Sequence, residues 1–322
     1  MPVYEHKAST GFIAAWLEQP FDRMKPDDPN YWELYVRFWM EMGFDCVPME
    51  IALYCPLGGE NSFAGAHTVG SESSVIIQNR SDYERYPWPD ESSPLDFKPY
   101  EIVASLLPSG AKIVGGVRRG PYEWVSGMLG TIGMSYLLVD DPELVAEIFR
   151  RIGRLHVSAA RQLASMDAFG ALRQGDDLGF KTSTFLSPDQ LRQYVFPIYT
   201  EMVKASHAHG KPFILHSCGN IDEVYEDLIN VCRIDAKHSF EDTILPVTEF
   251  KKRYGDRLVP VGGLDVDKVC RLPEKELRVY VRRTIEECFA DGNWILGTGN
   301  SLPDYMPVNQ YRIVLDEGTK TG

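Results

Sequence analysis

Residues 216–218 read His-Ser-Cys, and these residue types point more directly to chemistry than any other short motif in the chain. The motif follows an apolar run at 212–215 that has the length and composition of a buried strand. Because side chains two residues apart in an extended chain point the same way, His216 and Cys218 should lie side by side. Imidazole and thiolate are both zinc ligands. The motif therefore indicates part of a metal site, although a hydrogen-bonded histidine beside a half-buried cysteine is the plainer interpretation.

Polar residues also stand at or just after the ends of most other apolar runs. These residues are Glu50, Arg118 and Arg119, Asp176 and Asp177, His238 and Glu241, Asp265, and Thr298 and Asn300. The runs alternate with helical patterns, which predicts a parallel sheet covered by helices. A doubly wound sheet would collect its polar residues at one switch point. Their recurrence after nearly every strand favours a (β/α)₈ barrel of the TIM type, whose loops form the active-site face.

The elements before the barrel predict a helical segment and a small excursion. Apolar residues at helical spacing between residues 32 and 42 indicate helices within residues 1–43. Residues 58–92 combine a glycine pair, a short strand at 74–77 and a proline-rich turn, which suggests a hairpin that shields one side of the pocket. This excursion is too small for a separate domain, so we expect one domain over residues 1–322.

Composition narrows the classes of function. A net charge of −13 argues against a nucleic-acid or anionic-membrane surface. No apolar run approaches the roughly 20 residues of a membrane helix, and the first residues lack the pattern of a secretory signal. The six cysteines are scattered without a CxxC pair, so we expect reduced thiols. These features predict a cytoplasmic protein.

Several candidate residues have two interpretations from the sequence. Asp176 and Asp177 could cap a helix or act in the pocket. His238 could be a general acid or base, or a packing residue with satisfied hydrogen bonds. Of Arg118 and Arg119, one could bind an anionic substrate while the other forms an ordinary surface ion pair.

Three stretches of the chain resemble the uroporphyrinogen decarboxylase superfamily. They read GDDLGFKTSTFLSPDQLRQYVFPIYTEMVKASHAHGKPFILHSCGNI, IDAKHSFEDTILPVTEFKKRYGDRLVPVGGLDV and GNWILGTGNSLPDYMPVNQY, and the similarity spans about residues 100–315 in order. The resemblance implies a distorted barrel with a deep pocket at the carboxyl ends of the strands, and it favours Asp177 facing that pocket. One such barrel hosts several chemistries, so the resemblance leaves the reaction open.

The sequence is closer to the corrinoid-dependent methyltransferase branch than to the haem-pathway decarboxylase. The decarboxylase branch carries an arginine-rich signature near its start, and this chain has only Arg23 there. The methyltransferase branch binds zinc through H-x-C and a later cysteine. His216 and Cys218 match that motif, whereas the later position reads Gly297-Thr298-Gly299. Thr298 is a poor zinc ligand, so Glu50 is our candidate for the third ligand.

These observations lead to three hypotheses. The first is methyl transfer to or from a small corrinoid protein or methylcobalamin, with zinc at the H-x-C motif and a small-molecule substrate. The second is a decarboxylase-type carboxy-lyase acting on a cyclic or small acid, and the third is a non-catalytic tetrapyrrole- or corrinoid-binding protein. The expected roles are catalysis by Asp177, Glu241 and His238, substrate binding by Arg118, Asp265, Thr298 and Asn300, and metal binding by His216, Cys218 and Glu50.

Overall fold

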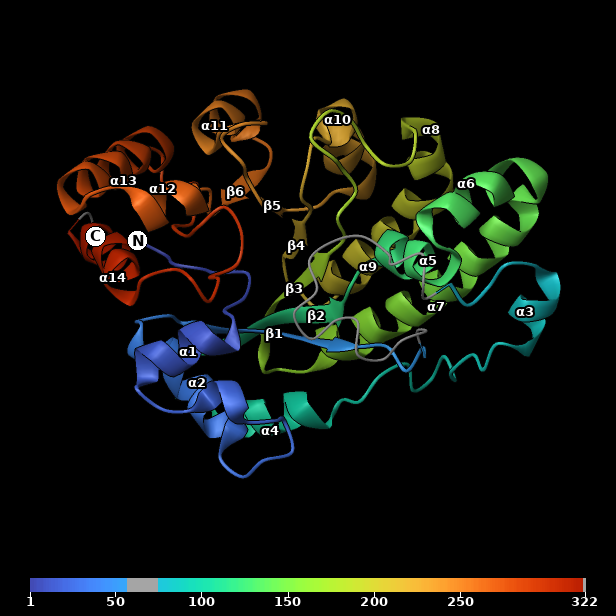
Figure 1. Cartoon of the computed structure of the whole chain (residues 1–322), viewed down its shortest axis with the longest axis horizontal. Helices are drawn as coiled ribbons and strands as arrows, with labels where there is room; N and C mark the ends of the chain where they lie inside the picture. The colour runs from blue at the N-terminus through green and yellow to red at the C-terminus, as the bar shows by residue number, and fades with distance from the viewer. Residues whose placement is uncertain (57–74, 321–322) are drawn as a thin grey trace.

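Six parallel strands form one sheet in chain order in the computed structural model, which describes residues 1–56 and 75–320 (Figure 1). The strands are β1 (Cys46–Ala52), β2 (Lys112–Arg118), β3 (Phe169–Gly175), β4 (Phe213–His216), β5 (Ala236–His238) and β6 (Val259–Val261). Each strand pairs in parallel with the next one in the sequence. The predicted alternation of strands and helices is therefore confirmed, and the carboxyl ends of all six strands meet at one edge.

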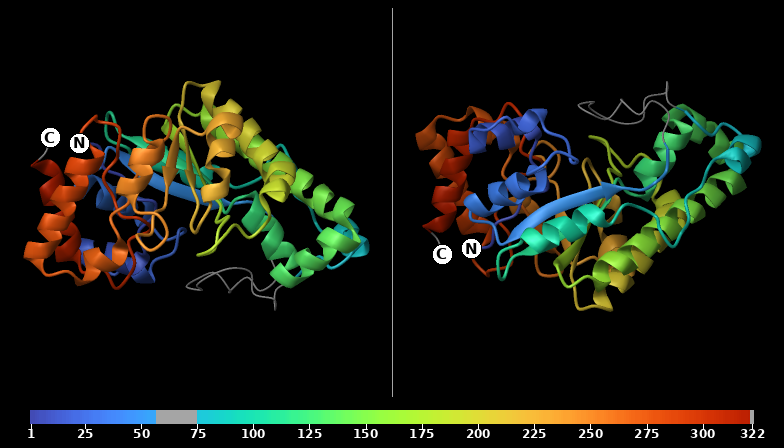
Figure 2. Two further views of the ribbon diagram at one scale, coloured as in Figure 1. Left: turned by 90° about the horizontal axis from the view of Figure 1, so that it is seen from above. Right: turned by 90° about the horizontal axis from the view of Figure 1, so that it is seen from below.

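Helices connect the strands and lie along the outside of the sheet (Figures 1 and 2). The helices before β3 are α1 (Thr10–Leu17), η1 (Phe21–Arg23), α2 (Tyr31–Glu41), α3 (Arg80–Arg85), α4 (Lys98–Leu106), α5 (Pro121–Leu129), α6 (Thr131–Asp140) and α7 (Pro142–Ser165). Those after β3 are α8 (Pro188–Gln190), η3 (Leu191–Val195), α9 (Phe196–His207), η4 (Asp222–Val224), α10 (Tyr225–Asp227), η5 (Leu228–Cys232), α11 (Val247–Tyr254), α12 (Val266–Arg271), α13 (Glu274–Cys288) and α14 (Val308–Thr319). Within the described ranges, no helix is both long and apolar enough to cross a bilayer.

Two irregular extended segments continue the sheet beyond β6. Residues 294–302 lie beside the end of β6, and residues 2–9 lie beside residues 294–302. The parallel bridges pair Val261 with Ile295, Leu264 with Thr298, Val3 with Leu296 and Ala8 with Leu302. The chain therefore has a TIM-like arrangement in which the described regular ladder holds six strands and does not close. The sequence pattern did not indicate the extended segment at residues 2–9.

The excursion expected at residues 58–92 differs from the predicted hairpin where the structure describes it. Residues 57–74 lie outside the described residues. The predicted strand is wrong for residues 75–77, because the amides of Ile76 and Ile77 both donate to the carbonyl of Met128 instead of to a partner strand. The helix α3 follows, since the Asn79 side chain accepts from the amide of Asp82 and so caps it.

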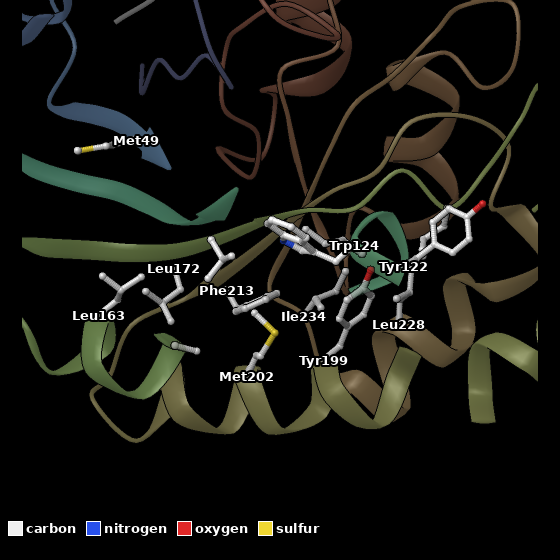
Figure 3. Packing of buried hydrophobic residues seen from close by; sticks show 14 of the residues in the cluster. Met49, Tyr122, Trp124, Leu163, Leu172, Tyr199, Met202, Phe213, Leu228 and Ile234 are labelled. Atoms are coloured by element: carbon white, nitrogen blue, oxygen red, sulfur yellow. The ribbon is translucent and has the colours of Figure 1, made fainter. Parts of the chain in front are cut away.

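Alternate residues of each strand face the helices or the interior of the barrel. On β4, Phe213 and Leu215 are fully buried in the apolar layer shared with the helices, whereas Ile214 belongs to a separate interior cluster. Figure 3 shows the outer layer, in which Phe213 lies near Met202 and Tyr199 of α9. The interior cluster contains Tyr4, Val114, Ala171, Ile214, Ala236 and Val261. His216 is two residues beyond Ile214, so its side chain points inward, next to this interior cluster.

A buried carboxyl attaches the first residues to the rest of the barrel. Glu5 is 0 % exposed. Its oxygens lie 2.7 Å from the amide nitrogen of Thr298, 2.6 Å from the Thr298 hydroxyl and 2.9 Å from the Tyr311 hydroxyl. Burial raises the pKa of Glu5 to about 7, although these hydrogen bonds act in the opposite direction. The Thr298 hydroxyl is also 2.8 Å from the carbonyl of Asn300, so a protonated Glu5 can donate to Thr298 while Thr298 donates onward.

The raised pKa of Glu5 predicts that part of the stability is lost as pH rises. An unfolded glutamate ionises near its ordinary pKa, so between that value and about 7 the folded state binds more protons than the unfolded state. The stabilisation that comes from protonated Glu5 is complete below the ordinary pKa of glutamate. It declines as pH rises and is lost above the folded-state pKa of about 7. Glu5→Gln mimics the protonated form. Between pH 5 and pH 8 we expect the wild-type chain to lose about 2 kcal/mol more unfolding free energy than Glu5→Gln, measured by urea denaturation. If the wild-type chain and Glu5→Gln lose the same unfolding free energy over this range, the pKa of Glu5 is not raised in the folded state.

Candidate active site

A layer of charged and imidazole side chains lies next to the interior cluster of apolar residues, on the side of the carboxyl ends of the strands. Arg173 of β3 is 1 % exposed and forms an ion pair with Glu50 of β1. It also donates to Nδ1 of His6 at 2.6 Å. Burial alone would raise the pKa of Glu50, but Arg173 and Lys7 hold it below the ordinary value. Glu50 is thus engaged by Arg173, instead of standing among the metal ligands as expected from the sequence.

Three histidines lie together in this layer. The ring of His6 stacks on that of His216 with centroids 3.7 Å apart, and Nδ1 of His216 lies 2.6 Å from Nδ1 of His238. Burial, together with the neighbouring cations, lowers the pKa of His216 well below its ordinary value and that of His238 to about 3. All three rings are therefore neutral imidazoles near pH 7, since burial also depresses the pKa of His6.

The loops that follow β3 and β4 pack backbone against backbone. The amide of Cys218 donates to Oδ1 of Asp177 at 2.9 Å. Gly219 has a φ of +81°, and a Cβ on it would lie 2.1 Å from the carbonyl oxygen of Gly179. Only a residue without a side chain allows this approach. The two glycines therefore bring Asp177, two residues before Gly179, against Cys218, the neighbour of Gly219.

Asp177, His216 and Cys218 present three ligand atoms of different chemistry to one point. Nε2 of His216 lies 3.6 Å from Oδ1 of Asp177 and 3.5 Å from Sγ of Cys218. All three ligand atoms are within 4.8 Å of one another. Zinc bonds of roughly 2.0–2.3 Å in a tetrahedron separate neighbouring ligands by about 3.3–3.8 Å. The donor set and the two distances from His216 therefore fit zinc, and a fourth coordination position would remain for a substrate.

A second group of potential ligands does not fit a metal. His6, His216 and His238 also lie within ligand distance of one another. However, Nδ1 of His6 accepts a hydrogen bond from the guanidinium of Arg173, and the 2.6 Å between the Nδ1 atoms of His216 and His238 is a hydrogen bond, too short for two ligands of one ion. A cation here would also face Arg173 directly.

Polar neighbours surround the thiol of Cys218. Its Sγ lies 3.3 Å from the hydroxyl of Ser239 and 3.5 Å from the side-chain amide of Asn300. Burial, and next the carboxylate of Asp177, raise the pKa of this thiol, and burial also raises that of Asp177. A divalent cation at this point would reverse both effects and favour the thiolate.

A cavity of about 170 Å³ opens beside these donors. Its lining residues are His6, Glu50, Arg118, Arg119, Glu123, Gly175, Asp177 and His216. A second cavity of about 290 Å³ shares His6, Glu50 and Arg118 with it and is walled by Tyr31, Trp32 and Tyr35. The two cavities together offer a small molecule an aromatic wall, the side chain of Arg118 and access to two of the donor residues, Asp177 and His216.

Glu123 of α5 is an acid that faces the first cavity. Burial, then the charges of Asp177 and Asp176, raise its pKa well above the ordinary value. The raised pKa favours the protonated form, in which Glu123 can donate a proton or a hydrogen bond into the cavity.

The structure separates the roles of Asp176 and Asp177. Asp176 is fully buried and accepts from the amides of Tyr122 and Glu123, at 3.0 and 2.9 Å, at the start of α5. It also accepts from the hydroxyl of Tyr199. Asp176 therefore caps a helix, whereas Asp177 lines the cavity.

Other residues expected in the site have different surroundings. Glu241 lines a separate, smaller cavity together with Lys237, a buried lysine whose pKa is lowered to about 8 by burial. Asp265 caps α12 by accepting from the amide of Lys268. The Thr298 hydroxyl binds Glu5, and His238 is fully buried behind His216.

Of the residues expected to bind substrate, Arg118 lines both cavities and Asn300 contacts Cys218.

Sequence reasoning missed His6, Arg173 and Glu123. The sequence FGALRQG of β3 contained a signal for Arg173, because a charged residue inside an apolar strand needs a buried partner. His6 and Glu123 carried no local signal. Both reach the site only because residues 2–9 join the sheet and α5 begins against Asp176.

A family model described as uroporphyrinogen decarboxylase (URO-D) matches residues 31–320. The chain belongs to this family. No curated protein matches this URO-D family member in sequence.

Solved structures similar to this URO-D protein include a methyltransferase from Methanosarcina mazei, at 15 % identity and a TM-score of 0.70, with 99 % of this chain and 94 % of that chain covered. A protein described as a vitamin-B12 independent methionine synthase from Listeria monocytogenes is similar at 12 % identity and a TM-score of 0.54, with 100 % of this chain and 97 % of that chain covered. At these identities, the similarity establishes the fold.

Proposed function

We propose that this URO-D family protein is a cytoplasmic methyltransferase that moves a methyl group to or from a corrinoid protein or methylcobalamin. We further propose that zinc is held by His216, Cys218 and Asp177. The supporting observation is that Nε2 of His216 lies 3.5 Å from the thiol of Cys218 and 3.6 Å from the carboxylate of Asp177. His216 and Asp177 also line a cavity that could hold a small molecule. The methyltransferase fold of the M. mazei neighbour is consistent with it.

The residues around the cavity suggest how the chain would assist this reaction. A bound zinc ion would supply Lewis acidity, which lowers the pKa of a substrate thiol or polarises a methyl donor. Arg118 would orient an anionic part of the substrate, because its guanidinium lines both cavities. When a methyl group passes from the substrate to the corrinoid, the substrate atom that loses it needs a proton. Glu123, an acid with a raised pKa that lines the cavity, would supply this proton.

One observation favours a second candidate, a decarboxylase-type lyase. Arg118 lines the same cavity as Glu123, whose pKa is raised. A guanidinium can hold a substrate carboxylate, and a protonated acid can then protonate the carbon that loses carbon dioxide. This chemistry needs no metal, so it predicts turnover that is independent of zinc.

Metal content and two product assays distinguish these candidates. The purified chain is analysed for metals before and after incubation with zinc. It is then supplied with methylcobalamin and a series of small thiols, and in parallel with cyclic and small acids. Methyl transfer predicts stoichiometric zinc and zinc-dependent loss of methylcobalamin absorbance. Carbon dioxide release without zinc would support the lyase, and corrinoid binding without any turnover would support a non-catalytic binding protein.

Asp177→Asn tests the third ligand. An amide is a weaker zinc ligand than a carboxylate, so we expect zinc affinity to fall about 10- to 100-fold, measured by competition with a chelator. Asp242→Asn is the matched control, because Asp242 is also a carboxylate in a loop after a strand but pairs with Lys268. Unchanged zinc affinity in Asp177→Asn would contradict its role as a ligand.

A further inference from the structure

The ring of His238 contacts one of the proposed metal ligands, His216. The His238 ring is fully buried and does not line the cavities described above. Its two nitrogens have one close partner each: Nδ1 lies 2.6 Å from Nδ1 of His216, and Nε2 lies 3.2 Å from the carbonyl oxygen of Thr298. His238 therefore connects a backbone carbonyl to one of the proposed ligands.

The carbonyl of Thr298 determines where the proton of His238 lies. A carbonyl oxygen only accepts, so Nε2 of His238 must carry the hydrogen of that contact. Among the described residues, the hydrogen-bond partners of the His238 ring are His216 and Thr298, and neither is a carboxylate. With its N–H at Nε2, the imidazole of His238 presents Nδ1 as an acceptor. The hydrogen between the two rings therefore belongs to Nδ1 of His216.

We propose that His238, held by the carbonyl of Thr298, is a positioning residue that fixes His216 in the tautomer whose Nε2 is unprotonated. This inference rests on the proposed metal site. The unprotonated Nε2 is the atom that lies 3.5 Å from Cys218 Sγ and 3.6 Å from Asp177 Oδ1. Metal-binding histidines commonly donate their other N–H to an outer partner that sets the tautomer. Here that partner is a second imidazole instead of a carboxylate.

The surroundings keep the Thr298 carbonyl in place. The amide and hydroxyl of Thr298 are both bound to Glu5, which fixes the position of Thr298. A Cβ on Gly262 would lie 2.2 Å from the Thr298 carbonyl oxygen and about 3.1 Å from the His238 ring. The glycine thus leaves the space in which carbonyl and ring meet. The residue that replaces the expected third cysteine therefore contributes its backbone to the site.

Two substitutions of His238 separate hydrogen bonding from packing. His238→Phe keeps a ring of similar size against His6 and Tyr4 but removes the acceptor. His238→Asn loses the ring but places an amide oxygen near the former Nδ1, where it can accept from His216. If the tautomer matters, zinc affinity should fall about 10- to 100-fold in His238→Phe and stay within about threefold of wild type in His238→Asn. A packing role predicts the opposite order, with Asn more damaging than Phe.

Nitrogen NMR of the metal-free protein gives a direct test that needs neither zinc nor turnover. The ¹⁵N shifts and couplings of His216, assigned by their loss in His216→Gln, should show a protonated Nδ1 and an unprotonated Nε2. A protonated Nε2 in the wild-type chain would overturn the proposal, as would wild-type zinc affinity in His238→Phe. If methyl transfer is absent but the expected tautomer is present, the proposed reaction fails while this hydrogen-bond chain stands.

Discussion

Cys218→Ser is expected to remove stoichiometric zinc and to lower kcat/KM for methyl transfer at least about a thousandfold. A serine hydroxyl does not ionise near neutral pH, so the substitution deletes the one soft anionic ligand of the set. The remaining donors, His216 and Asp177, are too few to hold zinc firmly. Metal analysis after dialysis against zinc, together with the methylcobalamin assay, measures both effects on the same sample.

Cys270→Ser is the matched control for this experiment. Cys270 is also a partly exposed free cysteine, but it lies in α12, away from the cavity. Its replacement should leave zinc content and turnover near wild type. Full zinc occupancy in Cys218→Ser, with kcat/KM within tenfold of wild type, would refute the metal site.

The second large effect is expected on stability. Arg173→Met removes the cation that neutralises Glu50 and the donor to His6. An unpaired buried carboxylate costs about 3–5 kcal/mol, so the unfolding temperature measured by calorimetry should fall by several degrees or more. Arg150→Met is the comparison, because Arg150 pairs with Glu143 on the surface with 56 % and 63 % of the side chains exposed. That change should lower the unfolding temperature far less than Arg173→Met does.

The double variant Arg173→Met/Glu50→Gln distinguishes loss of the ion pair from loss of packing. Removing the carboxylate as well eliminates the unpaired charge, so the double variant should be more stable than Arg173→Met alone. Additive losses from the two substitutions would show that the pair does not explain the effect.

The local part of the site was predictable, and the part that depends on packing was not. His216 and Cys218 lie on one side because two residues of extended chain dictate it. Asp177 and Arg118 were predictable because both follow or end a strand, and parallel strands bring their carboxyl ends to one edge of the sheet. The alternation of strands and helices likewise gave the architecture.

The choice of partners required the folded chain. From the sequence, Glu50 was the candidate for the third ligand, and Asp177 was expected to act in catalysis. In the proposed site Asp177 replaces Glu50, because Gly219 allows the loop of Asp177 to approach Cys218, whereas Glu50 is paired with Arg173. Nothing in the sequence around His6 revealed that it would stack on His216, because the bridges that hold it there join residues nearly 300 positions away.

That long separation has a consequence for synthesis. Residues 2–9 leave the ribosome well before residues 296–302, with which they pair. At about 5–20 residues per second, the early segment waits on the order of tens of seconds for its partner. During that interval the buried carboxyl and imidazole of Glu5 and His6 remain in water. The candidate site is therefore completed only after residues near 300 have been synthesised and have left the ribosome.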